Sequence, residues 1–462
     1  MLNFISQRAT RKTDIPVIPV TVKSYAKWLK TRSKREQNLL KTCTFKPEKG
    51  EYSLLTAEDG TLALVLIGIE NKEDIWSWAA LPSKLSDQHS YSIDESVEKI
   101  SLHHAVLGWK LGSYKYDNYT KKPTEFPTLI IPAKADTALA QEMASSICLT
   151  RDLINAPTND MGPSELAAEI KKISKECKAK YSEIIGDDLL KKNYPTIHAV
   201  GRACDDAPRL LELRWGNKKH PKLTLVGKGV CFDTGGLNIK GGKSMGMMKK
   251  DMGGAGFMLG LARLIMKMEL QVNLRLLIPA VENSISANAY RPQDVLTTRK
   301  GITVEISNTD AEGRLILCDA LAEADTETPD LLIDAATLTG AARVATGTDI
   351  PVFFSTDDKL TTQINKHAKS SGEMLWQLPL WDGYRYLLDS DIADIDHSAS
   401  TGYAGAITAA LFLKEFVTET KNWMHIDMMA WNTRNLPGRP RGGEAQGMRV
   451  LYSLLEARYG TA

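Results

Sequence analysis

Acidic side chains that suit a divalent cation lie close together in residues 308–315, which read Asn-Thr-Asp-Ala-Glu-Gly-Arg-Leu. Asp310 and Glu312 are two positions apart, and Arg314 follows two positions later. In an extended segment side chains alternate, so these three would point in one direction before Gly313 allowed a turn into a helix. Two carboxylates would then bind a hard cation, and the guanidinium would hold an anion. The alternative is a helix N-terminus, where acidic side chains complement the helix dipole without binding metal.

A glycine-rich segment upstream, residues 223–256, carries a second pair of acids. Its first four residues are mainly apolar and predict a buried strand, after which Asp233 and Asp251 flank a loop rich in glycine. Four carboxylates gathered in one pocket would repel one another, and most would be protonated. Two divalent cations would cancel four negative charges, and this balance is the physical argument for a dinuclear metal site.

Three segments of the chain resemble the signatures of the M17 leucyl aminopeptidase family, the cytosol aminopeptidases. The octapeptide at 308–315 matches the family's signature in full. The segment VGKGVCFDTGG, followed by Lys240 and Asp251, matches its other metal-binding segment at the same spacing, and AATLTGA at 335–341 matches a third element. The resemblance covers roughly residues 140–462.

Position by position, the resemblance implies two divalent ions per subunit (Mn or Zn, possibly Mg), and the ligands that it implies are Lys228, Asp233, Asp251, Asp310 and Glu312. Asp233 and Glu312 would bridge the two ions. Lys228 would have to bind as the neutral amine, because an ammonium has no lone pair to offer. The implied ligand atoms are mostly oxygens, which suit Mn, Zn and Mg alike, so the sequence does not indicate which metal is preferred.

The resemblance also implies two catalytic side chains and a substrate wall. Lys240 would stabilise the oxyanion of the tetrahedral intermediate. Arg314 would hold a bicarbonate ion that relays a proton, because a guanidinium does not lose its own proton in proteins. The residues expected to contact the first residue of the substrate are Met248, Thr337, Leu338 and Gly340. A methionine-containing pocket favours Leu and Met. We therefore expect a leucyl aminopeptidase that removes mainly apolar N-terminal residues from peptides, for intracellular peptide turnover.

The spacing of apolar segments predicts an α/β protein of two domains, since 462 residues exceed one ordinary core. We expect a smaller N-terminal α/β domain over 1–135, a linking helix over 136–155 and a larger catalytic domain over 156–462. Strands expected in the catalytic domain alternate with helices, at 196–201, 209–215, 223–227, 272–279 and 331–335. This alternation predicts a mostly parallel or mixed central sheet covered by helices, with ligands bound at its carboxyl edge.

Composition favours a globular cytoplasmic protein, with 43% hydrophobic and 25% charged residues. No apolar run approaches the roughly eighteen residues that a membrane span needs, and the N-terminus lacks an apolar signal core. The six cysteines are widely scattered, as is typical of reduced thiols. The expected partners are peptide substrates and, from the resemblance, further copies of the chain in a homohexamer; no membrane partner is expected.

Two other functions remain open. The first fifty residues carry twelve Lys or Arg against three acids, and a basic helix expected over residues 27–41 could contact nucleic acid in a DNA-binding or scaffold role. A solvated helix face or a subunit contact is the favoured interpretation, so nucleic acid is not expected as a partner. Another dinuclear metallohydrolase, such as a phosphoesterase, is the second alternative. Lys228 among the ligands and the complete octapeptide argue against it.

Overall fold

The computed structural model describes residues 4–399 and 401–460 of the chain. The chain divides into two compact units. The smaller unit runs to Cys148 and also contains Arg434–Arg441, whereas the larger comprises Leu149–Thr433 and the residues from Gly442 onward. A short segment near the C-terminus thus belongs to the smaller unit, so the two units are joined by more than one crossing of the chain.

Within the described residues, the smaller unit is built on a six-stranded sheet of order β1-β6-β5-β2-β4-β3. The strands are β1 Ile5–Gln7, β2 Ile15–Val20, β3 Tyr52–Thr56, β4 Leu62–Gly68, β5 Ser90–Ile93 and β6 Thr128–Ile131. All neighbouring pairs are parallel except β3 and β4. Its helices are α1 Val22–Leu29, α2 Lys34–Thr42, α3 Ile75–Ala80, α4 Leu102–Gly112 and the first part of α5 Ala138–Asn155.

The single basic helix expected over residues 27–41 was wrong, because α1 and α2 are separate helices. Thr21 caps α1, and Ser33 caps α2. At the second cap the Ser33 hydroxyl accepts from Glu36 N while the Glu36 carboxylate accepts from Ser33 N. This capping box starts a new helix within the basic stretch.

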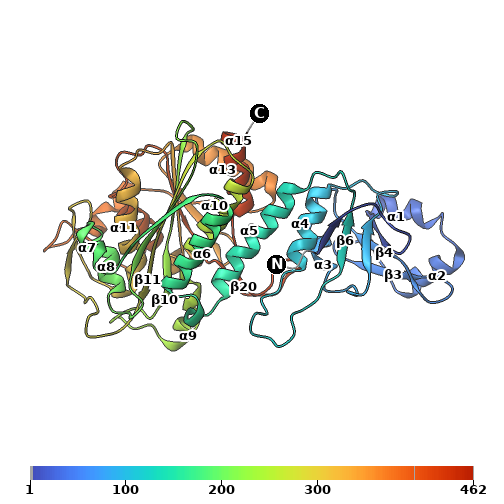
Figure 1. The fold of residues 1–462 in the computed structure, drawn as a ribbon, viewed down its shortest axis with the longest axis horizontal. Helices are drawn as coiled ribbons and strands as arrows, with labels where there is room; N and C mark the ends of the chain where they lie inside the picture. Colours follow the sequence, from blue (N-terminus) through green and yellow to red (C-terminus); the bar gives the residue numbers. More distant parts are fainter. Residues whose placement is uncertain (1–3, 400, 461–462) are drawn as a thin grey trace. The chain divides into compact units, whose positions relative to one another are not determined.

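The larger unit contains, among its described residues, a nine-stranded mixed sheet (Figure 1). Its order is β16-β15-β18-β14-β9-β11-β8-β7, and β10 lies outside this order and pairs with β11. The strands are β7 Lys180–Ile185, β8 Arg209–Gly216, β9 Lys222–Gly227, β10 Gly229–Asp233, β11 Asn273–Asn283, β14 Leu331–Ala336, β15 Val352–Ser355, β16 Trp376–Gln377 and β18 Trp423–Asp427. The central neighbours β18, β14, β9 and β11 are all parallel. The expected two-domain α/β fold with a mixed, helix-covered sheet is confirmed.

Helices cover both faces of this sheet (Figure 1). The helices of the larger unit are α6 Pro163–Glu176, α7 Asp188–Lys191, α8 Pro195–Gly201, α9 Gly242–Met245, α10 Gly253–Lys267, α11 Glu312–Asp325, α12 Gly340–Thr346, α13 Asp358–Ser371, α14 Gly405–Lys414 and α15 Met448–Tyr459. One face packs against α8, α11 and α14 through a fully buried core that includes Ile197, Leu317 and Phe412. The other face carries α6 and α10, with α15 beside α10.

Smaller pairings complete the larger unit. Strands β12 Val295–Thr297, β13 Thr303–Glu305 and β17 Ile395–Asp396 form a three-stranded sheet, and β19 Trp431–Asn432 pairs with β20 Gly442–Gly443. Short 3-10 turns occur at Thr158–Asp160, Met248–Met252, Thr309–Ala311 and Asp382–Leu388. None of the helices formed by the described residues is long and apolar enough to cross a bilayer.

One expected strand is a helix. Residues 196–201 lie in α8, which begins at Pro195 and is buried on the sheet face that also carries α11. A proline at the first helical position is favourable, because its missing N–H would have no helical partner. A short apolar run is compatible with either a buried strand or a buried helix, which explains the error.

Candidate metal centre

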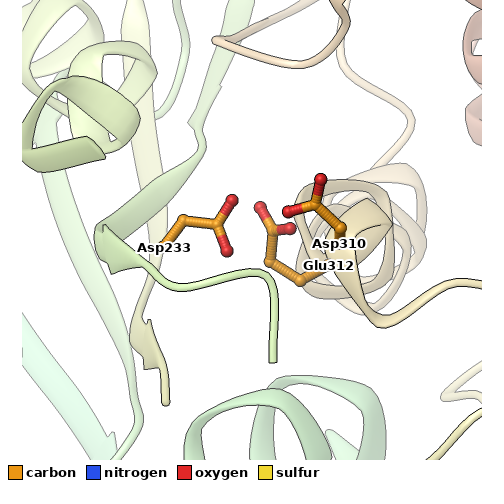
Figure 2. Close-up of side chains that lie close together, drawn as sticks. All are labelled: Asp233, Asp310 and Glu312. Atoms are coloured by element: carbon orange, nitrogen blue, oxygen red, sulfur yellow. The ribbon is translucent and has the colours of Figure 1, made fainter. Parts of the chain in front are cut away.

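The predicted site residues lie at the carboxyl ends of the central strands. Lys228 directly follows β9, Asp233 is the last residue of β10, and Thr337 directly follows β14. Asp251 lies on the 3-10 turn Met248–Met252, Asp310 lies on the 3-10 turn Thr309–Ala311, and Glu312 is the first residue of α11. Because these strands are parallel, their carboxyl ends meet at one edge of the sheet. Figure 2 shows the carboxylates of Asp233, Asp310 and Glu312 pointing toward one another.

Residues 308–315 adopt a different conformation from the extended segment that was expected. Asp310 lies in the 3-10 turn Thr309–Ala311, and Glu312 is the first residue of α11, so the extended segment was wrong. Asn308 caps the turn by accepting a hydrogen bond from Asp310 N at 3.0 Å. The turn, and not strand alternation, brings the two carboxylates together.

Gly313 has a role other than the expected turn. It lies inside α11, where a Cβ atom would come within 2.6 Å of Lys228 Cε and 2.7 Å of Lys228 Nζ. Any side chain at this position would therefore displace the lysine. The glycine leaves the space through which Lys228 reaches the carboxylates.

Lys228 bridges two of the four carboxylates. Its Nζ lies 2.7 Å from Asp251 Oδ2 and 2.9 Å from Glu312 Oε1, and it donates a hydrogen bond to Thr337 O at 3.0 Å. All three charged side chains are almost completely buried. Burial alone would lower the pKa of Lys228, but Asp251 and Glu312 outweigh it and raise that pKa above its ordinary value.

Lys240 bridges the other two carboxylates. Its Nζ lies 2.8 Å from Asp233 Oδ2 and 2.5 Å from Asp310 Oδ1. Its side chain is 14% exposed and that of Asp310 is 32% exposed, so this half of the centre faces solvent while the Lys228 half does not. A substrate would therefore meet Lys240 before Lys228.

Crowding of the carboxylates changes how readily they ionise. Burial and the nearby Asp233 raise the pKa of Glu312 to about 8. Burial and Asp251 likewise raise the pKa of Asp233. Burial also opposes ionisation of Asp251, but Lys228 and Lys250 overcome it and lower the pKa of that carboxyl. The centre is thus short of positive charge near Glu312 and Asp233.

The donor atoms can accommodate a cation. Single carboxylate oxygens of Asp233, Asp310 and Glu312 all lie within 4.8 Å of one another. Glu312 Oε2 is buried and accepts no hydrogen bond. A buried carboxylate oxygen without a partner is unfavourable, and a divalent cation would satisfy it.

Arg314 follows Glu312 by two residues in α11, and one donor of its guanidinium is unused. The residue is 7% exposed, and its Nη1 donates to His397 O at 2.6 Å. Its buried Nε has no hydrogen-bond partner. Burial lowers the pKa of Arg314 to about 10, so the side chain remains a cation at neutral pH. A guanidinium with a free donor is suited to holding an anion.

The four residues expected to contact substrate fall around the same edge. Thr337 is buried, and its hydroxyl donates to Asp251 Oδ1 at 2.8 Å. Half-buried Leu338 follows it, and exposed Gly340 begins α12. Met248 is half-buried at the start of the 3-10 turn that carries Asp251. Side chains three apart on a 3-10 turn share a face, so Met248 and Asp251 project to the same side.

Two residues that support the centre were not identified from the sequence. Asn283 at the end of β11 is fully buried, and its Nδ2 donates to Asp233 Oδ1 at 2.8 Å and to Thr309 O at 3.0 Å. Asp427 at the end of β18 accepts from Leu338 N, Thr339 N and the Thr339 hydroxyl. Both lie at the carboxyl ends of central strands, and that position is the signal that would have found them.

Family models match both units. Residues 148–452 match the catalytic domain of the cytosol aminopeptidase family, and residues 15–132 match the M17 aminopeptidase N-terminal domain. A probable cytosol aminopeptidase from Clostridium perfringens is 32% identical over 499 residues, covering 99% of this chain and 100% of the relative. Another, from Syntrophotalea carbinolica, is 39% identical over 369 residues, covering 76% and 74% respectively.

Solved structures agree with these matches. A cytosol aminopeptidase from Coxiella burnetii is 44% identical, with a TM-score of 0.94 over 99% of each chain. The bottromycin maturation enzyme BotP in complex with Mn is 28% identical, with a TM-score of 0.87 over 96% of this chain and 99% of BotP. The catalytic-domain model matches more than half of the chain, and the relative from Clostridium perfringens matches it over nearly its full length. This chain therefore belongs to the cytosol aminopeptidase family.

Proposed function

We propose that this chain is a metal-dependent leucyl aminopeptidase, which releases Leu and other mainly apolar residues from the N-termini of peptides. The observation that carries the proposal is the convergence of four carboxylates and two lysines at the carboxyl edge of the sheet. Membership of the cytosol aminopeptidase family supports the reaction class. Peptide turnover inside the cell is the role that fits such an activity.

Lys228, Asp233, Asp251, Asp310 and Glu312 would hold two divalent ions. Three of these carboxylates already offer oxygens within 4.8 Å of one another. The Mn complex of BotP supports Mn as one candidate, and Zn and Mg suit the same mostly oxygen ligands. When bound, the ions supply Lewis-acid polarisation of the scissile carbonyl and acidify the attacking water. A free α-amine is also a good metal ligand, which would restrict cleavage to the first peptide bond.

Lys240 would contact the reacting groups directly, whereas Arg314 would act through an anion that it holds. Lys240 is the more exposed lysine of the centre and would donate a hydrogen bond to the oxyanion as it forms. Arg314 would hold a bicarbonate ion, because its buried Nε has no partner of its own. As a permanent cation it cannot serve as the base, so the anion that it holds would move the proton from water to the leaving amine.

The substrate wall would consist of Met248, Thr337, Leu338 and Gly340. Thr337 fixes the wall to the centre through Asp251, and Met248 shares a face with Asp251. The flexible thioether would accept Leu and Met side chains. We also propose a cytoplasmic homohexamer for this enzyme.

A metal-exchange assay would test the proposal. The purified protein would be freed of metal with a chelator and resupplied with Mn, Zn or Mg, then given Leu-p-nitroanilide and bis-p-nitrophenyl phosphate in parallel. We expect metal-dependent release of p-nitroaniline and no phosphodiester cleavage. Phosphodiester cleavage without peptidase activity would instead identify the alternative dinuclear hydrolase.

A further inference from the structure

A cavity of about 380 Å³ lies in the larger unit, and none of the proposed metal ligands lines it. Its lining includes Gly186 and Asp187, which directly follow β7, and Pro208, which is two residues before the second position of β8. Strand β8 runs antiparallel to β11, and Arg209 at its start pairs with Ala280 near the end of β11. The cavity therefore lies at the same edge of the sheet as the centre. Its volume is in the range of small-molecule sites, which begins at roughly 300 Å³.

Arg202 lines this cavity with a guanidinium that is only partly used. The residue is half-buried, and its Nε donates to Asn288 O at 2.8 Å. The side chain forms no other hydrogen bond and no ion pair with the part of the chain that the structure describes. The bond to Asn288 orients the guanidinium, and its two amino groups are left for a ligand. Parallel N–H donors of this kind are suited to a carboxylate.

Two carboxylates line the same cavity without pairing with Arg202. Asp187 Oδ1 lies 3.1 Å from His198 Nε2, and the aspartate side chain is 86% exposed. Asp205 is exposed, and its carboxylate has neither a hydrogen bond nor an ion pair with any residue among those described. One cation and two anions therefore line a single cavity while staying apart. A ligand that carries both a carboxylate and an ammonium group would pair with both signs of charge.

We propose that this cavity binds a free α-amino acid, with its carboxylate on Arg202 and its ammonium group on Asp205. Asp205 suits the ammonium group better than Asp187 does, because Asp187 already has a histidine partner. Ala207 and Pro208 in the lining supply apolar surface for a side chain such as that of leucine. The site takes no part in bond cleavage. Leucine is nevertheless the product expected of the proposed peptidase, and this link alone rests on the proposed function.

The loop that follows β11 connects this cavity with the centre. At its start Asn283 donates to Thr309 O at 3.0 Å, and further on the Tyr290 hydroxyl donates to the same oxygen at 2.7 Å. Between these two residues Asn288 O accepts from Arg202, and residues 285–288 are exposed. A ligand on Arg202 would hold Asn288 more firmly. Binding should therefore protect this loop, whose two ends are bonded to the residue before a proposed metal ligand.

L-Leucine and two analogues provide the test, because the analogues each lack one charge. The protein would be freed of metal, so that no ion at the centre binds the α-amine, and titrated calorimetrically with each compound. Isocaproate is leucine without its amino group, and isoamylamine is leucine without its carboxylate. We expect L-leucine to bind and each analogue to bind at least about tenfold more weakly, the effect of losing a charge-assisted hydrogen bond. No binding of L-leucine, or equal binding of either analogue, would overturn the proposal.

Two variants at the cavity and one control would locate the binding. Arg202→Met removes the guanidinium, and Asp205→Asn removes the carboxylate charge at nearly constant size. Each should weaken L-leucine binding at least about tenfold. Arg11→Met changes an exposed arginine of the smaller unit and should bind L-leucine like wild type. Asp205 is exposed, so Asp205→Asn should fold even if Arg202→Met does not. Wild-type affinity in Asp205→Asn would contradict the assignment.

Amide hydrogen exchange gives a readout that needs no variant. L-Leucine should slow exchange in residues 284–290, because Arg202 holds this loop through Asn288 O. Binding of L-leucine without protection of 284–290 would place the amino acid elsewhere and overturn the proposal. Hydrolysis of Leu-p-nitroanilide by the metal-loaded protein is measured separately. Its failure would reject the proposed peptidase and leave the amino-acid site, whereas failure of L-leucine to bind would reject only the site.

Discussion

The four carboxylates of the centre differ in exposure, and removing a charge from any of them should affect metal binding. Glu312 is 1% exposed with an unpartnered oxygen, whereas the side chain of Asp310 is 32% exposed. We expect Asp310→Asn and Glu312→Gln each to abolish turnover and lose bound metal, because each removes a charged ligand. Elemental analysis of the purified variants would check this. Two ions still bound in both variants would reject the assignment.

A variant at Lys240 should separate the effect on catalysis from the effect on metal binding. Lys240→Ala should lower kcat about 10²–10³-fold, the effect of losing one oxyanion donor, while the metal content stays at the wild-type level. Steady-state kinetics together with metal analysis would measure both. An unchanged kcat would remove Lys240 from the reaction, and lost metal would show that it holds the carboxylates in place.

The stability of the metal-free protein should depend on pH because the pKa of the Glu312 carboxyl is raised. Its pKa in the folded protein is about 8, above the ordinary value of 4.5, so the folded metal-free protein holds a proton that the unfolded chain releases. Stability from this group is present at low pH and is lost as pH rises from about 5 to 8, by an amount on the order of a few kcal/mol. Urea unfolding of the metal-free protein should show this fall in wild type and in Glu269→Gln, but not in Glu312→Gln. An equal fall in Glu312→Gln would assign it to another group.

At the scale of single residues the sequence located the centre but not its geometry. Spacing and glycine content pointed to Asp233, Asp251, Asp310 and Glu312, and the structure brings all four together with Lys228 and Lys240. The turn at Asn308 was missed because side-chain alternation describes strands alone. The partnerless donor of Arg314 also had no signal, since a missing contact has no pattern in sequence.

Among the elements, the loop between β14 and α12 depends on Asp427. This carboxylate accepts from Leu338 N at 3.0 Å, Thr339 N at 3.0 Å and the Thr339 hydroxyl at 2.6 Å. Asp427→Ala would leave buried amides without acceptors and should cost about 2–4 kcal/mol. It should also weaken metal binding, because Thr337 in this loop contacts Lys228 and Asp251. Urea unfolding and a metal titration would measure the two effects, and wild-type values for both would refute this role.

The accuracy with which strands were predicted from the sequence depended on the pattern of their apolar residues. Strands β8, β9 and β14 were predicted near their observed bounds, because each contains a short run rich in apolar residues. The segment 196–201 failed because six mostly apolar residues do not distinguish a buried helix from a strand. Tertiary packing against α11 decides that case, and packing is not encoded in a local window.

For the whole molecule, exposed aromatic residues support the proposed assembly. Trp376, Trp381, Tyr386 and Tyr403 are each more than half exposed, and all four lie within one stretch of the larger unit. Burial of such side chains between subunits would be favourable. We expect sedimentation to give a mass about six times the 51.0 kDa chain. Trp381→Ala with Tyr386→Ala should reduce that mass, whereas Tyr119→Ala in the smaller unit should not. A monomeric wild type would contradict the hexamer.

The sequence predicted the number of domains but not every segment that belongs to each. The α/β pattern predicted two domains, as found. The return of Arg434–Arg441 to the smaller unit was not visible, because sequence patterns assign neighbours along the chain and not neighbours in space.

The two lysines that bridge the carboxylates have a consequence for how the proposed metal ions would bind. Each ammonium occupies the space between a pair of carboxylates, as a cation would. If metal ions bind as proposed, they would take over the carboxylates from the two ammonium groups, with Lys228 losing a proton and Lys240 changing partners. The rate of metal binding should therefore rise with pH.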